Sequence, residues 1–75
     1  MRYPNSEEFY KKVGKQLREL RKVNKLTQKE LGLRSDLEKS VIQRIERGAV
    51  NSTLRTLLKV ANALDVEFKD LFDFE

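Results

Sequence analysis

The sequence predicts an all-α fold, a compact five-helix domain that spans residues 1–75. Apolar residues recur at intervals of three and four through most of the chain, as they do along one face of a helix. Residues that favour helix starts precede several of these segments. Five helices account for the pattern and no β-strand is needed, so we expect helices alone to form the core.

The first helix is predicted from about Ser6 to Asn24. Either Asn5, with Glu8 three residues later, or Ser6 alone provides its cap. Its inner positions are Phe9, Val13, Leu17, Leu20 and Asn24. A basic stripe lies on the opposite side and consists of Lys11, Lys15, Arg18, Lys22 and Lys25. We interpret the basic stripe as a solvated surface rather than a binding surface, because it points away from the core that this helix covers.

The second and third helices are joined by a tight turn and form a helix-turn-helix unit over about residues 27–47. The second helix begins at Thr27, which has the spacing of a capping box with Glu30. It ends before the turn at residues 35–36. There the short polar side chain of Asp36 lowers the cost of a left-handed backbone.

The third helix is predicted from about Glu38 to Arg47. Leu37, Ile42 and Ile45 face inward, and Gly48 supplies the left-handed residue that ends the helix. Its outward side carries Ser40, Gln43, Arg44 and Arg47. Amide and guanidinium groups on a short exposed helix suit the major groove of DNA, because both make paired hydrogen bonds to purine edges.

The fourth helix is predicted to open at Thr53 and to end at Asp65. Its expected buried stripe is Leu54, Leu57, Leu58, Ala61 and Leu64. A short fifth helix, from about Glu67 to Phe72, should pack Val66, Leu71 and Phe72 on the core. Phe68 and Phe74 exceed what a small core needs, so they are a candidate dimer surface; alternatively, they only close the core.

Charge is distributed unevenly along the chain. The net charge is +4, but residues 9–59 hold 14 basic and five acidic residues, whereas residues 60–75 hold one basic and five acidic residues. A basic body suits a polyanion such as nucleic acid, and the acidic end suits a different partner. The alternative is a surface that is merely well solvated.

Several functional classes are excluded or disfavoured by composition. The chain has no cysteine and no histidine, so a disulfide framework, a thiol site and the usual transition-metal sites are not expected. We find no phosphate loop and no nucleophile with a partner base, so the protein is predicted not to be an enzyme and to need no cofactor. The first residues lack the apolar segment of a signal peptide, and no run is long enough to cross a membrane, which predicts a cytoplasmic protein.

The chain resembles the lambda-repressor-like helix-turn-helix family, the Xre/Cro type. The resemblance rests on LTQKEL, on VIQRIERG, and on NSTLRTLLKVANALDV followed by DLF, at the family's spacing over most of the chain. It implies that the third helix enters the major groove of double-stranded DNA. Many members of this family bind pseudo-palindromic operators as homodimers.

The expected site residues fall into three groups. Lys39, Ser40 and Arg44 match positions from which the family reads bases, the helical periodicity adds Gln43 on the same exposed side, and Arg44 is the best candidate for a guanine. The positions expected on the DNA backbone are Thr27, Gln28, Arg47 and Asn51. Arg21 and Glu46 are expected to be a structural pair that fixes the third helix against the first.

Four positions depart from the family pattern. Asp36 stands where Gly or Asn is usual, Glu38 replaces the usual Ser or Thr cap, and Ser52 and Asp65 replace a frequent Pro and Gly. None of these changes removes a core residue. Glu38 matters most, because a carboxylate at the groove repels phosphate unless it accepts from a cytosine amine.

The leading hypothesis is a sequence-specific transcriptional regulator, a homodimeric repressor with no small-molecule effector. The alternative is an antitoxin-type or controller-type protein whose main partner is another protein, such as a toxin, with DNA binding as autoregulation. The acidic end, residues 70–75, could dock a basic partner of this kind.

Overall fold

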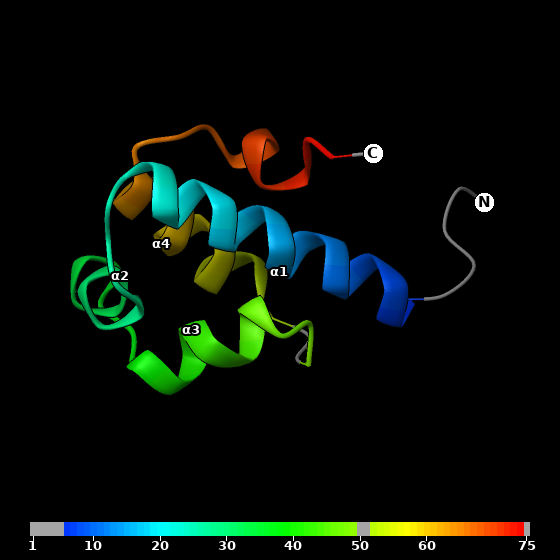
Figure 1. Cartoon of the computed structure of the whole chain (residues 1–75), viewed down its shortest axis with the longest axis horizontal. Helices are drawn as coiled ribbons and strands as arrows, with labels where there is room; N and C mark the ends of the chain where they lie inside the picture. The colour runs from blue at the N-terminus through cyan, green and yellow to red at the C-terminus, as the bar shows by residue number, and fades with distance from the viewer. Residues whose placement is uncertain (1–5, 50–51, 75) are drawn as a thin grey trace.

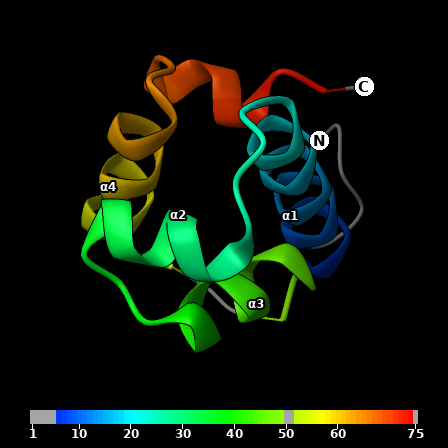
Figure 2. The same ribbon diagram turned by 60° about the vertical axis from the view of Figure 1, so that its left-hand side comes forward.

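The computed structural model describes residues 6–49 and 52–74 and is built from helices (Figure 1). The four α-helices are α1 (Ser6–Val23), α2 (Gln28–Ser35), α3 (Lys39–Glu46) and α4 (Leu54–Leu64), and they are followed by the short helix η1 (Phe68–Phe72). Helices α2 and α3 cross at one end of the molecule, and η1 spans the opposite side between α1 and α4 (Figure 2).

The expectation of five α-helices was wrong at the last element, because η1 is a 3₁₀ helix. The backbone N–H of Asp70 donates to the carbonyl of Glu67, three residues earlier, at 2.9 Å. The carboxylate of Asp70 in turn accepts from the N–H of Glu67 at 2.9 Å. A five-residue segment closed in this way has few positions at which an α-helical hydrogen bond could form, so the tighter 3₁₀ spacing is retained.

The core is formed where α1, α2, α3 and α4 meet. Its most deeply buried large side chains are Leu17, Leu31, Ile42, Val60, Leu64 and Leu71. Each helix therefore contributes at least one side chain that is removed from water, and η1 adds Leu71 from the other side. This shared burial fixes α3 relative to the other helices, because neither α2 nor α3, at eight residues each, is long enough to be stable alone.

The buried face of α4 differs from the prediction. Leu54 is 74% exposed and Leu58 is 49% exposed, although both were expected inside. The face that packs on the core instead runs through Leu57, Val60, Ala61 and Leu64. Leu54 is the first residue of α4 and lies beyond the helices that would cover it, and Leu58 lies at the edge of the buried face.

Helix α1 approaches α3 very closely at Gly14. A Cβ atom at this position would lie 2.6 Å from the carbonyl oxygen of Glu46 and would also collide with the carbonyl of Ile45. Only glycine permits this separation, because a side chain of any size would push the two helices apart. The sequence prediction did not identify this contact.

The capping box and the left-handed residues lie where they were expected. The N–H of Glu30 donates to Thr27 Oγ1 at 3.0 Å, and the N–H of Thr27 donates to Glu30 Oε1 at 2.8 Å. These bonds from Thr27 hold the pKa of the Glu30 carboxyl below its ordinary value. Asp36 has a φ of 59° and Gly48 a φ of 72°, which end α2 and the turn after α3. Helix α1 ends one residue earlier than predicted, and Asn24 is exposed.

An aromatic cluster joins the start of α1 to the C-terminal segment. The ring of Phe9 stacks on Phe72 with centroids 6.1 Å apart and contacts Phe74 at 5.8 Å. Phe68 meets Phe72 edge to face at 5.2 Å. Phe68 and Phe74 are consequently half-buried rather than free at the surface.

Among the described residues, no helix has the length and apolar character needed to cross a membrane. Within the same residues, no group of acidic side chains is arranged to hold a metal ion.

Candidate nucleic-acid interface

Helix α3 turns a polar face to solvent while its apolar face is buried. Ile42 and Ile45 are 0% and 4% exposed and anchor the helix in the core. The exposed face carries Lys39, Ser40, Gln43, Arg44 and Arg47. The structure therefore brings together on one surface all four residues predicted to read bases and one residue predicted to contact the backbone.

The start of α3 lacks a side-chain cap. Glu38 is the N-cap residue, is exposed, and makes no capping hydrogen bond through its carboxylate. Its carboxylate thus remains at the end of the helix that also carries Lys39 and Ser40. A carboxylate in this place accepts from donors such as the amine of cytosine and repels phosphate.

Arg21 of α1 and Glu46 of α3 form a shielded ion pair. Arg21 Nε donates to Glu46 Oε2 at 2.6 Å, and Nη2 donates to Oε1 at 3.0 Å. The remaining Nη1 donates to the carbonyl of Leu26 at 2.9 Å. The hydrogen bond with Glu46 raises the pKa of Arg21 above its ordinary value, and burial offsets part of that increase. The pair joins the last turn of α1 to the last turn of α3.

Gln28 joins this pair from the first turn of α2. Its Nε2 donates to Glu46 Oε1 at 3.1 Å, so one carboxylate receives hydrogen bonds from two other helices. The sequence prediction placed Gln28 only on the DNA backbone and missed this bond. An amide nitrogen carries two N–H donors, and the bond to Glu46 uses one of them. Gln28 is half-buried and can still offer the other donor to a ligand.

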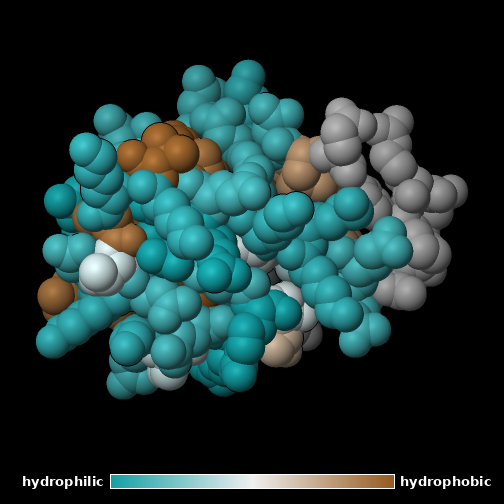
Figure 3. Space-filling view, viewed as in Figure 1, coloured by the Kyte–Doolittle hydropathy of each residue, from teal (hydrophilic) through white to brown (hydrophobic). Residues whose placement is uncertain are grey.

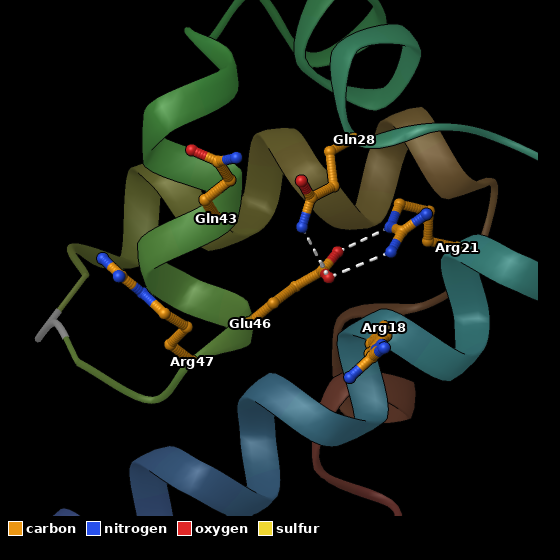
Figure 4. Close-up of a pocket in the computed structure, with 6 residues that line it drawn as sticks. All are labelled: Arg18, Arg21, Gln28, Gln43, Glu46 and Arg47. Atoms are coloured by element: carbon orange, nitrogen blue, oxygen red, sulfur yellow. Dashed lines mark hydrogen bonds and ion pairs between the residues drawn. The ribbon is translucent and has the colours of Figure 1, made fainter.

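An open hollow of about 330 Å³ lies where α1, α2 and α3 meet, and we call it the arginine hollow (Figure 4). Its lining residues are Arg18, Arg21, Gln28, Gln43, Glu46 and Arg47. Glu46 extends into the middle toward Arg21 and Gln28, Arg18 lies near Glu46 on α1, and Arg47 lies at the rim with its guanidinium turned away from Glu46 (Figure 4). The hollow adjoins the exposed face of α3, because Gln43 and Arg47 belong to both.

Arg18 was not among the predicted site residues. It precedes Arg21 by three positions on α1, so the two side chains are neighbours on the helix surface. That spacing could have identified it once Arg21 was assigned to the junction with α3. Thr27 is exposed but does not line the hollow, and Asn51 lies outside the described residues.

The face over α1 and α3 is covered mainly by hydrophilic side chains, with only separate apolar patches (Figure 3). Among the described residues, the most exposed large apolar side chains are Val23, Leu33, Leu54 and Leu58. None of them belongs to the exposed face of α3 or lines the arginine hollow. This surface therefore has the polar, basic character expected at a contact with nucleic acid.

Comparisons with known proteins agree with this geometry. The sequence profile of the family described as helix-turn-helix matches residues 17–71. The chain is 46% identical over 55 residues to the uncharacterized HTH-type transcriptional regulator y4dL of Sinorhizobium fredii, a match that covers 73% of this chain and 28% of that protein. It is 40% identical over 55 residues to the immunity repressor protein of Bacillus phage phi105, with 73% of this chain and 38% of that protein covered.

The fold is also similar to a solved structure of nearly the same length. The crystal structure of the restriction-modification controller protein C.AhdI from Aeromonas hydrophila matches with a TM-score of 0.83 and 43% identity, and covers 84% of this chain and 96% of that chain. The chain spans less than half the length of the two sequence relatives, whereas the controller protein is matched almost completely. Profile, relatives and fold together show that the chain belongs to the lambda-repressor-like helix-turn-helix family of DNA-binding transcriptional regulators.

Proposed function

We propose that this protein is a sequence-specific regulator that represses transcription as a homodimer, with α3 of each copy in the major groove of DNA. The observation that carries the proposal is the exposed polar face of α3 on a helix whose other face is fully anchored. Ile42 and Ile45 fix this helix in the core, and Glu46 ties its end to α1 and α2. Hydrogen-bonding groups held in this way meet base edges without first having to be ordered.

Base reading is assigned to Lys39, Ser40, Gln43 and Arg44, with the guanidinium of Arg44 on the O6 and N7 atoms of a guanine. Contacts with the sugar-phosphate backbone are assigned to Thr27, Gln28, Arg47 and Asn51. The exposure of Arg44 and the partial burial of Gln28 at the start of α2 support this division. The proposed site of action is the cytoplasm, where the DNA of bacteria such as those that hold the relatives lies.

A homodimer would place its two α3 helices in successive major grooves on one side of the duplex. The half-sites of a pseudo-palindromic operator should then lie about 10 base pairs, or about 34 Å, apart. Phe68 and Phe74 remain the candidate dimer surface, although the aromatic cluster holds both half-buried.

The experiment that tests base reading begins by selecting bound duplexes from a random pool. Arg44→Ala should then lower affinity for the selected site by about 1–3 kcal/mol, with a much smaller loss on a scrambled site. Lys69→Ala removes the same charge from η1, on the side of the molecule away from α3, and should change neither affinity appreciably. Equal losses on both duplexes for Arg44→Ala would assign Arg44 to a phosphate instead.

A second candidate function is that of a controller-type or antitoxin-type protein with a protein partner. It is favoured by the nearly complete match to C.AhdI and by the acidic segment, where residues 60–75 hold five acidic residues and one basic residue. Co-purification from the native host, with and without nuclease, separates this function from DNA binding alone. A basic protein that stays bound after nuclease treatment would support the second candidate.

A further inference from the structure

We propose that the arginine hollow binds a backbone phosphate of duplex DNA, and that Arg18 of α1 is an anchoring residue there. This inference rests on the proposed function and extends the DNA-binding surface from α2 and α3 onto α1. It also gives Arg18 a different role from the other members of the basic stripe, which we interpret as solvated.

The first argument is the charge of the hollow. Its lining includes three guanidinium groups and one carboxylate. That carboxylate, on Glu46, already accepts two hydrogen bonds from Arg21 and one from Gln28. Among the described residues, the guanidinium groups of Arg18 and Arg47 have no ion-pair or hydrogen-bond partner. The hollow therefore presents two guanidinium groups whose charges are not balanced by any described neighbour.

The second argument is the type of ligand that these groups fit. A guanidinium group offers parallel N–H donors that match two oxygens of one phosphate. Gln28 adds its unused amide N–H beside them, and Gln43 adds an amide on the far side of the hollow. Donors from α1, α2 and α3 thus line one open recess. Among the described residues that line it, Glu46 supplies the only carboxylate, and this carboxylate is already paired with Arg21 and Gln28.

The third argument is position. Gln43 and Arg47 lie both in the hollow and on the exposed face of α3. A duplex that receives α3 in its major groove must therefore pass one strand beside the hollow. The bound duplex itself holds a phosphodiester of that strand in place. We therefore take the ligand of the hollow to be a DNA phosphodiester and not free inorganic phosphate.

The test compares Arg18→Ala with Lys15→Ala in the full chain. Both residues are exposed members of the basic stripe, and each variant removes one positive charge. Lys15, however, lines a separate hollow with Glu19 and Asp73 and is not among the residues that line the arginine hollow. Circular-dichroism melts of both variants check that each remains folded before binding is measured.

Arg18→Ala should weaken binding by roughly tenfold at 100 mM salt, by the same factor on selected and scrambled duplexes. It should also reduce the slope of log affinity against log salt by about 1. Lys15→Ala should change affinity less than roughly twofold, because Lys15 does not line the arginine hollow and its charge lies beside the carboxylates of Glu19 and Asp73. Equal effects of the two variants would overturn the inference.

Neutral methylphosphonate groups, placed one at a time along the operator, identify the phosphate. At one position the substitution should weaken the wild type but not Arg18→Ala, because the contact is already lost. When inorganic phosphate replaces chloride at equal ionic strength, the difference between the wild type and Arg18→Ala at this position should stay the same. A methylphosphonate scan in which both proteins lose affinity equally at every position contradicts the inference. If the wild type binds no duplex, the proposed function itself fails, which is a distinct result.

Discussion

Removing Arg21 should destabilise the domain more than removing any exposed arginine. Arg21→Ala deletes two hydrogen bonds to Glu46 and one to the carbonyl of Leu26. The carboxylate that remains has a side chain only 5% exposed and keeps one donor, Gln28. Breaking a fully buried ion pair costs about 3–5 kcal/mol. Because Gln28 stays and the Arg21 side chain is 11% exposed, we expect a loss of about 3 kcal/mol, at the low end of this range.

A loss of this size in a small domain corresponds to a fall in Tm of roughly 12–24 °C. Glu46→Gln should cost less, about 1–2 kcal/mol, because the Arg21 guanidinium loses its counter-charge but can still donate to the amide oxygen and to the carbonyl of Leu26. Thermal and urea unfolding at neutral pH measure both values. Arg55→Ala, an exposed arginine on α4, is the matched control and should change stability by about 0.5 kcal/mol or less. The reasoning is refuted if Arg21→Ala unfolds no more easily than Arg55→Ala.

Three further predictions address other parts of the molecule. Glu30→Gln should lower stability at neutral pH. Folding lowers the pKa of the Glu30 carboxyl, so its contribution to stability is fully present above the unfolded pKa and is lost as pH falls through the folded pKa. The melts of the two proteins should therefore converge once the pH is below the folded pKa. Gln28→Ala should weaken binding to selected and scrambled duplexes by the same factor, because phosphates recur at every step, and an unequal loss in titrations would contradict a backbone role. Phe68→Glu or Phe74→Glu should lower the sedimenting mass at matched concentration, and an unchanged mass in folded variants would move the dimer surface elsewhere.

The parts of the fold that sequence predicted are those set by near neighbours. Thr27 and Glu30 are three residues apart and close a capping box without help from the rest of the chain. Asp36 and Gly48 adopt left-handed backbones, as their residue types favour. The exposed face of α3 follows from its apolar spacing alone. These features therefore needed no knowledge of how the helices pack.

The parts that were missed depend on residues far apart in the sequence. The spacing of leucines in α4 is helical on more than one face, so only the position of the other helices decides that Val60 is buried and Leu54 is not. The bond from Gln28 to Glu46 spans 18 residues and requires α2 and α3 to be docked. The role of Arg18 depends on the same docking, because its side chain becomes part of a hollow only when α3 is in place.

The close approach at Gly14 has a consequence for redesign of this protein. Helices α1 and α3 can approach this closely because Gly14 has no Cβ atom, which would collide with the carbonyl of Glu46, the last residue of α3. The outer face of α3 takes no part in that contact. Exposed residues of α3 such as Ser40 and Arg44 should therefore be replaceable together by those of a relative without loss of the fold, provided that Gly14 and Glu46 are kept. A graft that altered Gly14 would misalign even a perfectly chosen set of reading residues.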